Sequence, residues 1–178
     1  PFHVLHIFGP GGVGKTSLLG QWMRICQEMG IPAIYLDGRN LEPAPESFLS
    51  GLRFVMGLET TASPLEVLRD RTTRHVIFID TYETLAPLDD WLREEFLPQL
   101  PEITLIILAS RYQSNWRIDS GWQALLQTVS LRNLSPEESR TYLSRREIPS
   151  AQHQAVLDFT HGQPLALSLV ADVFAQGQ

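Results

Sequence analysis

The chain reads Gly-Pro-Gly-Gly-Val-Gly-Lys-Thr from Gly9 to Thr16, which is a G-x-x-x-x-G-K-T pattern. Residues 3–8 before it form a short, mostly apolar run, typical of a buried strand, and apolar residues recur at helical spacing after it. A strand, a glycine loop and a helix N-terminus in this order aim backbone N–H groups at an anion. The stretch therefore indicates a phosphate-binding P-loop, and its expected ligand-binding residues are Gly9, Gly11, Gly12, Val13, Gly14, Lys15, Thr16 and Ser17.

The same glycines also allow a second interpretation. They spell G-x-G-x-x-G, and Asp37 ends a second apolar run, as the carboxylate of a dinucleotide-binding unit does. Lys15 favours the P-loop, because it is the only lysine among 14 basic residues and a compact ammonium fits among phosphates. The pattern predicts that Lys15 reaches the β- and γ-phosphates and that the Thr16 hydroxyl holds Mg²⁺.

Apolar strand-like runs alternate with helical patterns up to Leu134, and this alternation predicts an α/β fold with a five-stranded parallel sheet covered on both faces. After Leu134 only helical patterns remain, which predicts an α/β core over 1–134 and a small helical lid over 135–178. The expected strands are 3–8, 33–36, 75–79, 103–109 and 128–131. The expected helices are about 15–29, 46–57, 64–73, 89–97, 120–127, 136–146, 151–160 and 165–175.

Composition narrows the possible classes of protein. With 178 residues, 43% of them hydrophobic, the chain can bury one good core. Its net charge of −6 and the lack of a basic run argue against a nucleic-acid surface within this segment. The single cysteine, Cys26, excludes an internal disulfide and lies on an apolar helix stripe, so we expect it to pack. No apolar stretch is long enough for a membrane span, so we expect a cytoplasmic domain. We also expect this domain to be part of a longer protein.

Two carboxylates follow the third expected strand. Asp80 ends the run His75–Asp80, as the Mg²⁺-supporting aspartate of a P-loop protein does, although it could merely cap the next turn. Glu83, three positions later, could orient or deprotonate the attacking water or be a solvated loop acid. Thr81 occupies the position at which many ATPases of this type have their acidic base, so hydrolysis could be slow.

An arginine and a proline complete the set of candidate residues. Arg111 follows an apolar strand, at the sheet edge where ligands bind in α/β folds, and could read the γ-phosphate. The alternative is a surface arginine paired with a nearby carboxylate. Pro164 follows Gly162 at the start of the last helix, where a purely structural role is also adequate.

Together these motifs resemble the nucleotide-binding core of the STAND class of signal-transduction ATPases, the AAA+-related proteins that include NB-ARC and NACHT proteins. Gly9–Thr16 is similar to Walker A, Ile77–Asp80 to Walker B, Ser110-Arg111 to sensor 1, and Gly162–Ala166 to the G-x-P motif of the lid. The resemblance implies the strand order 5-1-4-3-2, ATP or ADP with Mg²⁺ as ligands, and adenine packed against Pro164. It also implies flanking domains of a longer chain and association of copies in the ATP-bound state as partners.

The resemblance is incomplete. The motif expected before the first strand and the winged-helix domain expected after the lid are absent from this chain, and Thr81 departs from the acidic form of Walker B. The sequence thus predicts a slow, Mg²⁺-dependent ATPase switch with Lys15, Asp80, Glu83 and Arg111 as catalytic candidates. Two alternatives stay open: a small-molecule kinase with an acceptor pocket near Asp37–Arg39, and a nucleotide-binding scaffold without hydrolysis.

Overall fold

The computed structural model describes residues 3–114, 116 and 120–176. The chain separates into two compact units. The α/β unit comprises Pro1–Phe8 and Lys15–Ser130, and the helical unit comprises Gly9–Gly14 and Leu131–Gln178. Residues 9–14 thus group with the helices, and the predicted boundary after Leu134 stays a prediction.

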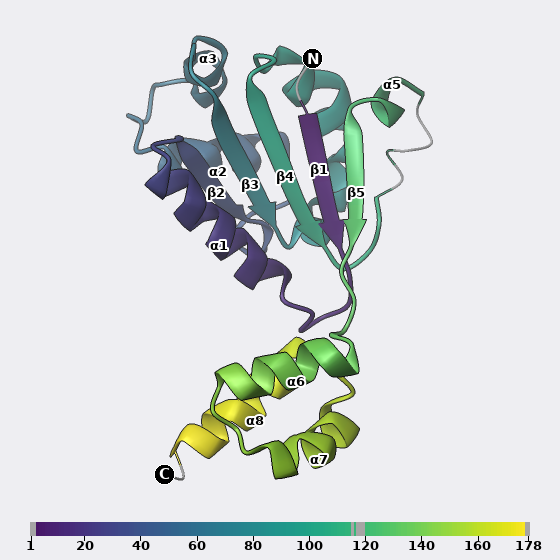
Figure 1. Cartoon of the computed structure of the whole chain (residues 1–178). Helices are drawn as coiled ribbons and strands as arrows, with labels where there is room; N and C mark the ends of the chain where they lie inside the picture. Colours follow the sequence, from purple (N-terminus) through teal and green to yellow (C-terminus); the bar gives the residue numbers. More distant parts are fainter. Residues whose placement is uncertain (1–2, 115, 117–119, 177–178) are drawn as a thin grey trace. The chain divides into compact units, whose positions relative to one another are not determined.

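The α/β unit is built on a five-stranded sheet with the order β2-β3-β4-β1-β5, in which all neighbouring strands run parallel (Figure 1). This is the order that the family resemblance implied. The strands are β1 (His3–Phe8), β2 (Ala33–Asp37), β3 (His75–Asp80), β4 (Thr104–Ser110) and β5 (Leu126–Ser130).

Both faces of this sheet are covered, as the apolar strand sequences predicted. On β3, Val76 and Phe78 pack into one cluster with Leu19 and Cys26 of α1 (Lys15–Glu28). The intervening side chains, Ile77 among them, pack on the opposite face in a larger cluster. Because side chains alternate along a strand, the middle of a strand buried on both faces is expected to be apolar at consecutive positions. The larger cluster receives Phe48 and Leu52 from α2 (Pro45–Val55), Leu68 from α3 (Pro64–Arg69), Leu85, Leu88, Leu92, Phe96 and Leu97 from the segment after β3, and Trp116 and Trp122.

Most helices form close to their expected positions, with three differences. The predicted helix 64–73 ends earlier, at Arg69. The predicted helix 120–127 ends as the short α5 at Gln123, and β5 begins at Leu126 instead of residue 128. The predicted helix 89–97 is instead a short α-helix, a π-helical turn and a 3₁₀ turn in succession. The helices of the α/β unit are α1 (Lys15–Glu28), α2 (Pro45–Val55), α3 (Pro64–Arg69), α4 (Asp89–Trp91) and α5 (Ser120–Gln123). The tighter or wider turns are η1 (Gly38–Asn40), η2 (Tyr82–Leu88), the π-helical η3 (Leu92–Phe96) and η4 (Leu97–Gln99).

The helical unit packs α6 (Pro136–Arg145), α7 (Ser150–Thr160) and α8 (Pro164–Gln176) around a core of its own. Leu143 and Leu167 are fully buried in that core. The capping box predicted at the start of α6 is confirmed: Ser135 Oγ accepts from Glu138 N, and Glu138 Oε2 accepts from Ser135 N at 2.6 Å. In the described part of the chain, no helix combines the length and apolarity needed to cross a bilayer.

Candidate nucleotide site

The candidate residues of the α/β unit lie at the carboxyl ends of its strands. Asp37 at the end of β2 pairs in register with Asp80 at the end of β3, and Phe8 of β1 pairs with Ser110 of β4. Because the strands are parallel, all these ends meet at one edge of the sheet, where α/β folds bind their ligands. Lys15 and Thr16 start α1, which has no acidic residue in its first turn to compete with an anion.

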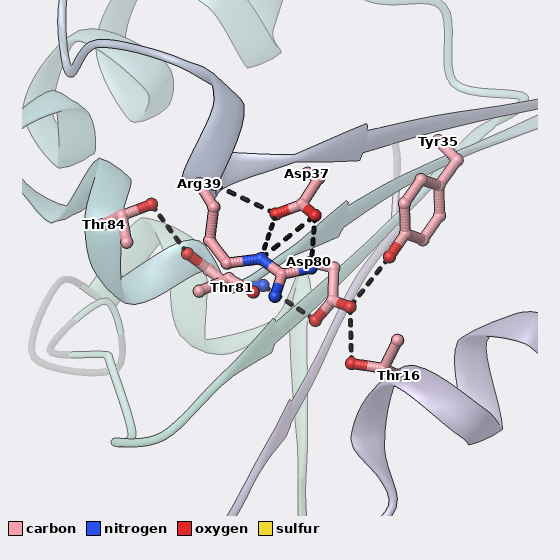
Figure 2. Close-up of polar contacts among 7 residues, drawn as sticks. All are labelled: Thr16, Tyr35, Asp37, Arg39, Asp80, Thr81 and Thr84. Atoms are coloured by element: carbon pink, nitrogen blue, oxygen red, sulfur yellow. Dashed lines mark hydrogen bonds and ion pairs between the residues drawn. The ribbon is translucent and has the colours of Figure 1, made fainter. Parts of the chain in front are cut away.

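Asp80 is the centre of the polar contacts at this edge (Figure 2). Its side chain is buried, and its Oδ2 accepts from Thr16 Oγ1 at 2.7 Å and from Tyr35 OH at 2.8 Å. Its Oδ1 accepts from the backbone N of Thr81 at 2.8 Å. A buried carboxylate is costly unless its oxygens are hydrogen-bonded, and here both are. The proposed Walker A threonine and Walker B aspartate are therefore in direct contact.

Tyr35 is a residue of the site that the sequence did not reveal. Burial and the hydrogen bond to Asp80 raise the pKa of its phenol well above the ordinary range, so the hydroxyl stays a donor. Its contact depends on the pairing of β2 with β3, which no local pattern specifies. The neighbouring carboxylate of Asp37 accepts from Arg39 N at 3.0 Å and from Arg39 Nη2 at 2.6 Å, and the Arg39 side chain lowers the pKa of Asp37.

Thr81 adopts a left-handed backbone conformation, with φ 53° and ψ 41°. This region is costly for a β-branched residue, and such outliers concentrate at functional sites. The strained residue is held on both sides: its N donates to Asp80, and its carbonyl accepts from Thr84 Oγ1 at 2.9 Å. The conformation turns the chain from β3 into η2 directly behind the carboxylate.

Glu83 and Arg111 contact each other. Arg111 Nε lies 3.2 Å from Glu83 Oε1, and Arg111 N donates to Glu83 Oε2 at 3.2 Å. The paired surface arginine that the sequence allowed is thus what this structure contains, and the roles in γ-phosphate sensing and catalysis stay predictions. Both groups act on Lys15: burial lowers the pKa of its ammonium, the carboxylates of Glu83 and Asp80 oppose that, and Arg111 adds to it.

A hydrogen-bonded chain joins the end of β4 to the buried His6 of β1. Ser110 Oγ donates to the carbonyl of Tyr112, so it accepts from His6 Nε2, 2.7 Å away. Nδ1 of the same ring then accepts from Ser114 Oγ at 3.1 Å. The contacts specify a neutral imidazole with its hydrogen on Nε2, and burial accordingly lowers the pKa of His6 to about 4. These hydrogen bonds fix the backbone on both sides of Arg111.

The glycines of the loop belong to the helical unit, and two of them are required by close contacts there. A Cβ on Gly9 would lie 2.6 Å from the carbonyl oxygen of Leu131, closer than packed atoms approach. Gly12 has φ +77°, and a Cβ there would lie 3.1 Å from both Gln163 Nε2 and Leu165 Cβ. In the same unit, Pro164 is the first residue of α8, as expected for the proline of a G-x-P motif.

Several solved structures share this fold. RuvB of Thermotoga maritima has a TM-score of 0.60 at 16% identity, covering 96% of this chain and 53% of its own. Cdc6p of Pyrobaculum aerophilum has a TM-score of 0.60 at 14% identity, covering 81% and 43%. The FIGL-1 AAA domain, solved in complex with ADP, has a TM-score of 0.56 at 19% identity, covering 90% and 55%. The α/β fold is that of AAA+ P-loop ATPase domains.

The likeness concerns the fold, and this chain spans about half the length of the solved chains it matches. No protein-family model matches the chain, and no curated protein sequence matches it.

The donor atoms at Asp80 suit a magnesium ion. Among the described residues no group of three or more histidines, cysteines and carboxylates gathers as a metal cage. Mg²⁺ beside a nucleotide needs no such cage, because it takes one or two protein oxygens and completes its shell with phosphates and water. Thr16 Oγ1 and Asp80 Oδ2 provide two hard oxygen donors 2.7 Å apart. The residues present therefore fit a Mg²⁺–nucleotide complex.

Proposed function

We propose that this chain is the ATP-binding switch module of a multidomain signal-transduction ATPase of the STAND class, and that it hydrolyses ATP slowly. One observation carries the proposal. Thr16 and Asp80 are 64 positions apart in the sequence, yet their side chains are hydrogen-bonded at the ligand-binding edge of an AAA+-type sheet. Two motifs found independently in the sequence thus form one arrangement of oxygen donors beside the single lysine.

The proposed roles follow from the chemistry of each residue. The backbone amides of Gly11–Ser17 and the Lys15 ammonium bind the phosphates, Thr16 and Asp80 hold Mg²⁺, and Pro164 packs against adenine. When bound, Mg²⁺ neutralises phosphate charge and polarises the γ-phosphate. Glu83 orients the attacking water, and the threonine at position 81, where an acid is expected, accounts for slow turnover.

The switch needs a contact that ATP makes and ADP does not, because a ligand shifts a conformational equilibrium only through differential affinity. Arg111 can supply it. Its guanidinium is paired with Glu83 and 63% exposed, so a γ-phosphate can compete for it without breaking a buried contact. Exchange of Glu83 for the γ-phosphate would alter the loop after β4, and flanking domains of the longer cytoplasmic protein would respond. We also propose that ATP-bound copies associate.

Calorimetric titration with MgATP tests the proposal. Lys15→Ala removes the cation placed among the phosphates, so we expect ATP affinity to fall at least about tenfold while the fold is retained. The matched control is Arg24→Ala, because Arg24 is another cation of α1 whose contacts are to Gln21 and Glu28 on the same helix. Equal ATP affinity in Lys15→Ala and the unaltered chain would rule out the P-loop assignment. Release of phosphate in a single turnover separates the ATPase from a scaffold.

A small-molecule kinase is the second candidate, and one observation favours it. A surface cavity of about 810 Å³ is lined by Tyr35, the residue bonded to Asp80, and by Asp37, Asn40 and Ser47. It lies where an acceptor pocket was expected from the sequence. The two candidates differ in the destination of the γ-phosphate: label from ATP should appear in inorganic phosphate for the switch ATPase, and in an added metabolite extract for the kinase.

A further inference from the structure

The start of α8 contacts two carbonyl groups of the glycine loop, within the helical unit. Gln163 Nε2 donates to the carbonyl of Gly11 at 3.2 Å, and Leu165 N donates to the carbonyl of Gly12 at 3.1 Å. The approach is so close that a Cβ at Gly12 would lie only 3.1 Å from an atom of each residue, which would have to move by a few tenths of an ångström. A side chain next to Pro164 thus holds the backbone proposed to bind phosphate.

These contacts determine where the loop amides point. In a trans peptide the C=O and the following N–H point in opposite directions, and the peptide bonds of the described chain are all trans. With the carbonyls of Gly11 and Gly12 directed at α8, the amides of Gly12 and Val13 face away from it. Both amides belong to the segment proposed to cradle the phosphates.

The side chain of Gln163 is not needed to start α8. Its backbone carbonyl accepts from Leu167 N at 2.9 Å, which starts the hydrogen-bond ladder of α8 whatever the side chain is. The side-chain amide is therefore available for the loop. A loop rich in glycine has many conformations to lose on binding, and fixing one of its carbonyls removes part of that cost beforehand.

We propose that Gln163 is a positioning residue for the phosphate-binding loop: it holds the Gly11 carbonyl so that the Gly12 amide is oriented for a polyphosphate. The inference rests on the proposed function and extends it. It makes the affinity for phosphate groups, as well as for the base, depend on the helix that begins at Pro164.

The test uses two probes, MgATP and inorganic tripolyphosphate with Mg²⁺, titrated calorimetrically into the chain. Tripolyphosphate has no base, so it reports on the phosphate cradle alone. Gln163→Met keeps the length of the side chain and removes its donor. We expect both affinities to fall by the same factor, about three- to tenfold, as for the loss of one hydrogen bond.

Two further variants act as controls. Gln154→Met makes the same exchange on α7, where the amide bonds Arg140 and Asp158 and does not touch the loop, so both affinities should stay unchanged. Pro164→Ala should weaken ATP and leave tripolyphosphate unaffected, because the proposed contact of Pro164 is with adenine. If Gln163→Met does not fold, the same titrations are made with Gln163→Asn. The asparagine side chain is one methylene shorter, so its amide does not reach the Gly11 carbonyl.

The outcomes distinguish the two proposals. A Gln163→Met variant that binds tripolyphosphate as the unaltered chain does, or that loses affinity for ATP only, would overturn the positioning role and leave the proposed function intact. If the unaltered chain binds neither probe, the proposed function fails and the inference fails with it. An equal loss for both probes with an unchanged unfolding temperature would establish the role.

Discussion

The two units hold different kinds of candidate residues. The α/β unit holds the side chains that carry charge or are proposed to bind metal, namely Lys15, Thr16, Asp80, Glu83 and Arg111. The helical unit holds the loop glycines, whose proposed contribution is backbone N–H groups, together with Pro164. The Walker A motif is divided between them at the peptide bond from Gly14 to Lys15. The difference teaches that a continuous sequence motif need not belong to one structural unit.

Each unit has a hydrophobic core of its own. The test with the largest expected effect destabilises one core at a time. Leu52 of the α/β unit and Leu143 of the helical unit are both fully buried. Replacing either leucine with alanine should cost about 2–5 kcal/mol. If the units unfold separately, Leu143→Ala lowers amide hydrogen-exchange protection in α6–α8 but not in β3, and Leu52→Ala does the reverse. Equal loss of protection in both units from either variant would show one cooperative structure.

A second test acts on the α/β unit through pH. Burial lowers the pKa of His6 from 6.5 to about 4. Between these two pH values the imidazole is protonated in the unfolded chain and neutral in the folded chain. The stability due to neutral His6 is complete above pH 6.5 and declines as pH falls towards 4, by about 1.4 kcal/mol per pH unit. His6→Asn should flatten this decline. All four tryptophans lie in the α/β unit, so urea unfolding followed by tryptophan fluorescence measures that unit.

His75 needs separate consideration in this experiment. Burial lowers its pKa too, so it contributes a decline of the same sign. His75 is present in the His6→Asn variant as well as in the unaltered protein. The difference between their pH curves of unfolding free energy therefore reports on His6 alone. Parallel pH curves for the His6→Asn variant and the unaltered chain would show that His6 is not held neutral by the fold.

The smallest expected effect concerns the charged side chains alone. Arg111→Ala should weaken ATP binding about tenfold, or about 1.4 kcal/mol, and leave ADP affinity within a few-fold. Arg39→Ala is the matched control, since Arg39 is also an exposed arginine paired with a carboxylate near a strand end, with 65% exposure against 63% for Arg111. Competition calorimetry with both nucleotides measures the ratio. Equal losses for ATP and ADP would make Arg111 structural.

The sequence predicts local features of this molecule well. The apolar run His75–Asp80 identifies a doubly buried strand, and Ser135 with Glu138 identifies the start of α6. The run Trp122–Leu126 is compatible with either a helix or a strand. The helix stops at Gln123 and the chain is extended from Leu126 onward, because β5 pairs with β1 there. The π-helical turn Leu92–Phe96 has no signature that distinguishes it from an α-helix of the same composition.

The rest of the site depends on pairings between distant residues. Tyr35 meets Asp80 only because β2 lies beside β3 in a particular register. His6 meets Ser110 for the same reason across β1 and β4. That Gly11 and Gly12 contact α8 is a matter of tertiary packing. Local periodicity does not encode such neighbours, so sequence reasoning identified the motif residues but not the groups that hold them.

The left-handed backbone of Thr81 bears on how easily this protein could change by substitution. A β-branched residue with φ 53° occupies one of the few conformations in which aspartate or asparagine is more comfortable than threonine. Aspartate at this position would therefore meet no backbone obstacle, and it would stand where the sequence analysis expected an acidic base. The slow turnover proposed above would then be maintained against a local conformational preference, and Thr81→Asp would supply the missing acid by a single exchange.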